Sequence, residues 1–152
     1  MNATASRRRS PVATAFGVLS VLYAATFLLG ALLHTGARIP LGFAVLAEPT
    51  ITMATIVESA CGIALAVGAY AVLTRQRWAW AAATASHAVA LTGVLLGTAA
   101  IAAGRGPHTV LNDTYHRVMI VVLLAGLLAL ATPATSLLGR SVHGSRPGED
   151  SR

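Results

Sequence analysis

The sequence predicts an all-α integral membrane protein, a four-helix bundle with up-down-up-down topology. Of its 152 residues, 55% are hydrophobic and only 11% are charged, which is too apolar for an ordinary soluble domain. Four apolar runs are each long enough to cross a hydrocarbon core of about 30 Å. The 11 basic residues are all arginines, and most of them lie outside these runs. We therefore expect one membrane domain over residues 11–138.

The two ends of the chain differ from this domain in composition. Residues 1–10 are polar and basic, and they predict a disordered cytoplasmic tail. The apolar run that follows is longer than that of a signal peptide, and further apolar runs come after it. Residues 139–152 are polar and contain Gly, Ser and Pro, which predicts a second disordered cytoplasmic tail.

The first two spans are expected over residues 12–34 and 50–73. Helical spacing places five residues of the first span on one face, which we expect to look into the bundle: Phe16, Tyr23, Phe27, Gly30 and His34. The connector, residues 35–49, has an apolar middle. It is expected either to lie along the membrane surface or to dip back as a short re-entrant segment. Pro49 immediately before the second span suits a helix start.

The third and fourth spans are expected over residues 78–103 and 114–138. Only residues 74–77 separate the second span from the third, which forces an antiparallel hairpin. Trp78 and Trp80 are typical of an aromatic belt at the membrane interface. A stripe of small residues in the third span predicts close approach of another helix: Ser86, Ala90, Gly93 and Gly97. Asn112 and Asp113 are N-cap candidates for the fourth span.

The distribution of arginines predicts the orientation in the membrane. The two tails and the short connector carry eight of them, whereas the two longer loops and their flanks carry only Arg38, Arg105 and Arg117. Because cytoplasmic segments are enriched in basic residues, both termini are expected in the cytoplasm and both longer loops outside. This placement favours a multi-pass protein of the cell, or inner, membrane and not a nucleic-acid-binding surface.

Glu58 is the most informative residue because it lies inside the second apolar run. A charged side chain at mid-membrane costs on the order of 2.5 to 3.5 kcal/mol, so a compensating partner is expected. His87 lies near the middle of the third span, within one or two helical turns of Glu58 in depth. A neutral hydrogen-bonded pair and an ion pair are both open. The residues expected to bind a ligand or relay a proton are Glu58, His87, Tyr23 and Thr55.

Further polar residues gather at the outer rim of the predicted bundle. They are His34, His108, Asp113 and His116. Three imidazoles and a carboxylate could hold a divalent metal, but the same residues could also cap a helix or meet lipid headgroups. Haem stays open as a second cofactor, although no histidine matches the expected depth of His87. Cys61 is the only cysteine, which excludes an intrachain disulfide and a thiolate-rich metal site.

The favoured hypothesis is a non-enzymatic membrane subunit or a ligand- or cofactor-binding protein with a polar intramembrane cavity open to the outer side. A proton-coupled transporter that uses Glu58 and a membrane redox or metal protein that uses the rim histidines are the alternatives. The sequence contains no arrangement of nucleophile and base and no nucleotide-binding motif, so catalysis of the soluble-enzyme type is not expected. The expected partners are membrane lipids and either further copies of the chain or a larger membrane complex, not nucleic acid.

Overall fold

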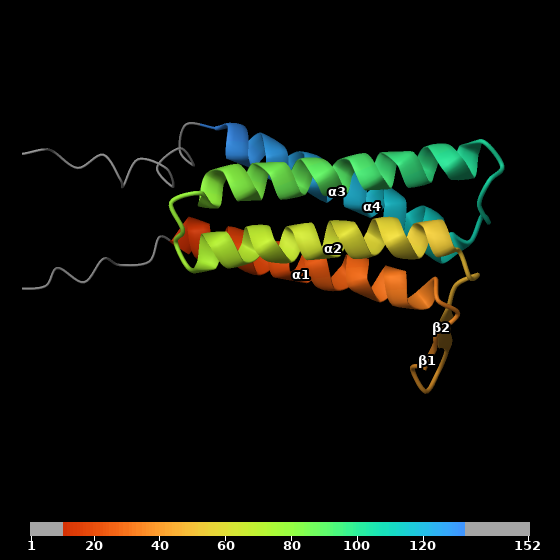
Figure 1. Cartoon of the computed structure of the whole chain (residues 1–152). Helices are drawn as coiled ribbons and strands as arrows, with labels where there is room; N and C mark the ends of the chain where they lie inside the picture. The colour runs from red at the N-terminus through yellow and green to blue at the C-terminus, as the bar shows by residue number, and fades with distance from the viewer. Residues whose placement is uncertain (1–10, 133–152) are drawn as a thin grey trace, which may run out of the picture.

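The computed structural model describes residues 11–132, which form four α-helices and a two-stranded β-hairpin (Figure 1). The elements are α1 (Pro11–Leu33), β1 (Arg38–Pro40), β2 (Val45–Ala47), α2 (Thr52–Leu73), α3 (Ala79–Ala102) and α4 (Val110–Ala131). All four helices are long and apolar enough to cross a membrane. This confirms the predicted number of spans and indicates a multi-pass membrane protein. The predicted tails and the predicted end of the fourth span lie outside the described residues.

Each helix packs against the next one along the chain. The loops 34–51 and 103–109 lie at one end of the bundle, called here the hairpin end, and the short connector 74–78 lies at the other (Figure 1). α1 and α4 meet through side chains, with the ring of Phe27 edge-on to that of Tyr115 at 5.9 Å. All four helices contribute to the central core: Ala24, Phe27, Cys61, Leu65, Ala90, Val94, Met119 and Leu123.

The outer faces of the helices are also apolar. Large hydrophobic side chains are exposed on all four, among them Leu22, Ile56, Leu96 and Leu128. Exposed apolar surface of this extent is unfavourable in water, whereas lipid chains solvate it well. The five-residue face predicted for the first span does look inward, because Phe27 and His34 are buried and Phe16 contacts a ring of α3.

Glycines bring the helices close together. A Cβ atom at Gly62 of α2 would lie 2.8 Å from the Leu28 side chain and 3.2 Å from the Ala24 carbonyl oxygen of α1. A Cβ atom at Gly93 of α3 would lie 2.6 Å from the sulfur of Cys61. The close approach that the small-residue stripe predicts is therefore confirmed at Gly93.

The start of α4 differs from the prediction. The helix begins at Val110, four residues before the predicted start, and its N-cap is Thr109. The Thr109 hydroxyl accepts a hydrogen bond from the backbone N–H of Asn112 at 3.0 Å. Asn112 and Asp113 therefore lie within the helix, and their assignment as caps is wrong. Asp113 still has a favourable position, because a carboxylate in the first turn complements the helix dipole.

The connector between α1 and α2 forms a β-hairpin and not a re-entrant segment. β1 and β2 pair antiparallel with Ile39 opposite Leu46. Gly42 in the turn has a φ of +84°, a conformation that glycine adopts without strain. Phe43 beside it is 91% exposed. Figure 1 shows the hairpin extending sideways from the bundle, across the direction of the helices, so it does not turn back between them.

Substitution of Gly62 tests the contact between α1 and α2. Gly62→Val should destabilise the bundle by about 1–3 kcal/mol, because the added atoms meet the backbone of α1, which cannot move aside locally. The measurement is the thermal unfolding midpoint of the purified protein in detergent. Ala60→Val, on the exposed side of the same helix, is the matched control. Equal midpoints for the two variants would contradict the described packing.

Candidate functional site at the hairpin end of the bundle

A cavity of about 440 Å³ opens at the hairpin end of the bundle. Its walls come from all four helices and from both loops at this end. Most of the lining is apolar, with a few polar side chains: His34, Glu58, Arg105, Asn112, Tyr115 and His116. A smaller pocket of about 110 Å³ lies in the seam between α1 and α4. His34, Glu58, Asn112 and Tyr115 line both of these spaces.

Glu58 extends from α2 toward α1 and is only 6% exposed. Its carboxyl group lies against Gly30, where a Cβ atom would be 2.6 Å from Oε2. Glycine at this position thus creates the space that the carboxyl group occupies. Oε1 lies 3.9 Å from Nε2 of His34, within ion-pair distance. Oε2 is buried and has no hydrogen-bond partner among the described residues.

His34 has a fixed ring orientation. Its Nδ1 lies 3.0 Å from the carbonyl oxygen of Pro49. Because a carbonyl oxygen only accepts, Nδ1 must carry a proton. Nε2 then faces the Glu58 carboxyl either as the acceptor of a neutral ring or as the second N–H of an imidazolium. At 3.9 Å the two groups are beyond hydrogen-bond distance, so the contact is an ion pair when the ring is protonated and the carboxyl group is ionised.

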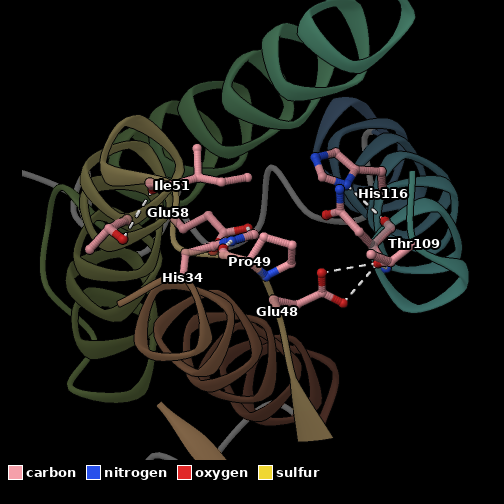
Figure 2. A network of polar contacts seen from close by, with 9 residues as sticks. His34, Glu48, Pro49, Ile51, Glu58, Thr109 and His116 are labelled. Carbon is pink, nitrogen blue, oxygen red and sulfur yellow. Dashed lines mark hydrogen bonds and ion pairs between the residues drawn. The ribbon is translucent and has the colours of Figure 1, made fainter. Parts of the chain in front are cut away.

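His116 of α4 repeats this arrangement on another wall of the cavity. Its Nδ1 lies 2.9 Å from the carbonyl oxygen of Asn112 and donates to it. Its Nε2 lies against Gly97 of α3, where a Cβ atom would be only 2.5 Å away. In a neutral ring Nε2 is therefore an acceptor. Viewed along the bundle, His34 and Glu58 lie together and His116 lies across from them (Figure 2).

A polar bridge connects the first loop to the start of α4 at the hairpin end of the bundle. The Thr109 hydroxyl lies 2.9 and 3.0 Å from the two carboxylate oxygens of Glu48 and donates to this carboxylate (Figure 2). The same hydroxyl oxygen caps α4. The negative charge of Glu48 thus lies at the N-terminus of α4, where the helix dipole favours it. Glu48, through Thr109, fixes the position of the loop that carries Pro49.

His87 lies elsewhere in the bundle. It is 1% exposed, its Nδ1 donates to the Ala83 carbonyl oxygen at 2.9 Å, and its Nε2 has no partner among the described residues. Its ring packs against those of Phe16 and Tyr23, with centroid distances of 5.0 and 6.2 Å. On α1, Tyr23 and the Gly30 that contacts Glu58 are seven residues apart, about 10 Å along the helix.

The structure therefore does not bring Glu58 and His87 together. The difference in depth between Glu58 and His87 is at the upper end of the one to two helical turns expected from the sequence. The imidazole that lies beside the Glu58 carboxyl group is that of His34. Tyr23 contacts His87 and not Glu58. Thr55 donates to the Ile51 carbonyl oxygen at 3.3 Å, so its hydroxyl bonds within the first turn of α2.

The four residues predicted to bind a metal lie in two places. His34 and His116 line the cavity, whereas His108 and Asp113 form an exposed pair with Nδ1 and Oδ2 3.4 Å apart. Within residues 11–132, no three His, Cys, Asp or Glu side chains gather closely enough to hold a metal ion. The four predicted ligands are not assembled, because His34 and His116 line the cavity whereas Asp113 pairs with His108 outside its lining.

Several features of the site have no clear signal in the sequence. The Pro49 carbonyl oxygen orients His34, yet any residue could supply that atom. Asn112 and Tyr115 line the cavity, although the sequence marks Asn112 only as an N-cap candidate and gives no reason to single out Tyr115. Gly30 is the exception, because it lies four residues before His34 on the face of α1 that the sequence already assigns to the interior.

Comparison with known proteins adds no further information. No protein-family model matches the chain, and neither the search of curated proteins nor the search of solved structures finds a similar protein. The function must therefore be inferred from the cavity and its side chains.

Proposed function

We propose that this chain is a small integral membrane protein that binds a small, mostly apolar molecule in the cavity at its hairpin end. In this proposal it acts without catalysis, as a ligand- or cofactor-binding protein or as a subunit of a membrane complex. The observation that carries the proposal is the Glu58 carboxyl group: Glu58 lines the mostly apolar cavity, and its buried Oε2 has no hydrogen-bond partner among the described residues.

The dimensions and the lining support this proposal. A volume of about 440 Å³ lies within the range of small-molecule sites, which are typically apolar with a few placed polar groups. A buried polar atom without a hydrogen bond costs about 1–3 kcal/mol, and a ligand that supplies the missing bond recovers part of that cost. A structural role for Glu58 alone would not require a cavity beside it.

Orientation in the membrane is part of the proposal. The arginine count supports cytoplasmic termini, which places the hairpin end and the cavity mouth on the outer side. The hairpin then lies along the outer membrane surface, with the exposed ring of Phe43 at the level of the headgroups. Assembly into an oligomer or a larger complex stays a prediction, to be tested by copurification.

Filling the cavity should abolish binding. Ala100 lines the cavity, whereas its neighbour Ala99 is exposed on the outside of α3. We expect the protein in nanodiscs to bind 2-methoxynaphthalene or 2-naphthol saturably above empty nanodiscs in equilibrium dialysis. Ala100→Phe should reduce this binding at least about tenfold because the new ring occupies the cavity.

Ala99→Phe is the matched control and should bind as the native chain does. The proposal fails if neither naphthalene compound binds saturably, or if Ala100→Phe and Ala99→Phe bind them equally well.

Cysteine labelling tests the orientation. In a Cys61→Ala background, Ala44→Cys in the hairpin should react with a membrane-impermeant maleimide in intact cells. Gln76→Cys, in the connector at the opposite end, should react only after the cells are lysed. The opposite pattern would place the cavity mouth in the cytoplasm and contradict the proposed orientation.

Proton-coupled transport is the second candidate, and one observation favours it. Glu58 lines the cavity, and its carboxyl group lies 3.9 Å from the imidazole of His34. A transporter should carry protons into proteoliposomes together with a small amphipathic solute, as a pH-sensitive dye inside them would report. Glu58→Gln should abolish that flux. If the protein only binds its ligand, neither the native chain nor the Glu58→Gln variant gives a proton flux.

A further inference from the structure

Two polar groups of the cavity lining can accept a hydrogen bond from a ligand, the imidazole of His116 and the carboxyl group of Glu58. Nδ1 of His116 is occupied by the Asn112 carbonyl oxygen, so Nε2 of the neutral ring offers only a lone pair. Glu58 also lines the cavity, and its carboxyl group only accepts hydrogen bonds when it is ionised. A ligand that complements these two groups supplies a hydrogen-bond donor.

The charges around the cavity argue against a cationic ligand. His34 carries no negative charge in any state, and its imidazolium form offsets the charge of an ionised Glu58 carboxyl group 3.9 Å away. Arg105 lines the same cavity from the loop between α3 and α4, and its positive charge repels a cation at the mouth. The donor that this site favours is therefore uncharged.

The rest of the lining fits an apolar body. The ring of Phe27 stands edge-on to that of Tyr115, and both line the cavity. Gly93 and Gly97 provide a part of the α3 wall without side chains. The Tyr115 hydroxyl is buried without a partner among the described residues, and it both donates and accepts, so it is compatible with a hydroxyl ligand.

We propose that the cavity takes a neutral, largely apolar molecule with a hydroxyl head that donates to Nε2 of His116 or to the Glu58 carboxyl. This inference rests on the proposed ligand-binding function and narrows it to one class of ligand. Alcohols and phenols belong to this class. Ethers with the same apolar part, amine cations and carboxylates do not.

A matched set of ligands tests the proposal without changing the protein. The probes are 2-naphthol, its methyl ether 2-methoxynaphthalene and the cation of 2-(aminomethyl)naphthalene, dialysed against the full chain in nanodiscs at pH 8, where imidazole is ordinarily neutral. We expect 2-naphthol to bind about tenfold more tightly than the ether, which is the effect of one hydrogen bond to a buried acceptor. The cation should bind more weakly than the phenol.

Two variants assign the acceptor. His116→Phe and Glu58→Gln each replace a side chain with one of similar size, and at least one of them should remove the preference for the phenol. Binding of the ether, which needs no acceptor, should persist in that variant and shows that the cavity is still folded. If neither variant changes the preference, the phenol is recognised elsewhere and the proposal is wrong.

The outcomes separate this inference from the proposed function. If both neutral probes bind and Ala100→Phe blocks them, but the ether binds as tightly as the phenol, ligand binding stands and the hydroxyl class is wrong. Tighter binding of the cation than of the phenol would also contradict the proposal of a neutral hydroxyl ligand. If no probe binds, the proposed function itself fails.

Discussion

The arrangement at the hairpin end depends on the burial of one carboxyl group, that of Glu58. An ionised carboxyl group in an apolar bundle is unfavourable without compensation. The bundle compensates it with the imidazole of His34, which lies one turn beyond Gly30 and immediately after the end of α1. His34 in turn requires the Pro49 carbonyl oxygen, and the loop that carries this atom is fixed to α4 through Glu48. A chain of polar contacts thus connects a residue inside the bundle to the loops at its end.

The buried histidines share one structural device. In each of His34, His87 and His116, Nδ1 lies within hydrogen-bond distance of a backbone carbonyl oxygen, which leaves Nε2 directed elsewhere. The rings of His87 and His116 also lie against glycines of a neighbouring helix, Gly126 and Gly97. A carbonyl that fixes one ring nitrogen determines the tautomer of a neutral histidine, and a glycine opposite provides the space for the ring. The bundle can therefore hold polar rings in its interior with their second nitrogen in a defined role.

The sequence predicts features of a single helix better than contacts between helices. Span number and the inward face of α1 follow from hydropathy and helical periodicity, so Glu58 and His34 were both recognisable as special positions. The pairing of Glu58 with His34 and not with His87 was not recognisable, because it depends on the relative depth of neighbouring helices. The hairpin was missed because its pattern of small and apolar residues also fits a surface segment. The start of α4 at Val110 adds about one helical turn to the predicted helix, and Asn112, a residue of the cavity lining, lies in that turn.

The pairing of Glu58 with His34 is the central claim, and solid-state NMR tests it most directly. The chain contains only three glutamates, Glu48, Glu58 and Glu149, so the carboxyl carbons can be assigned with single-residue variants. With ¹³C-labelled glutamate and ¹⁵N-labelled histidine in lipid bilayers, the account predicts a dipolar coupling between the carboxyl carbon of Glu58 and Nε2 of His34. It also predicts a proton on Nδ1 of His34. A coupling of Glu58 to His87 instead, or a His34 ring protonated on Nε2 alone, would contradict the account.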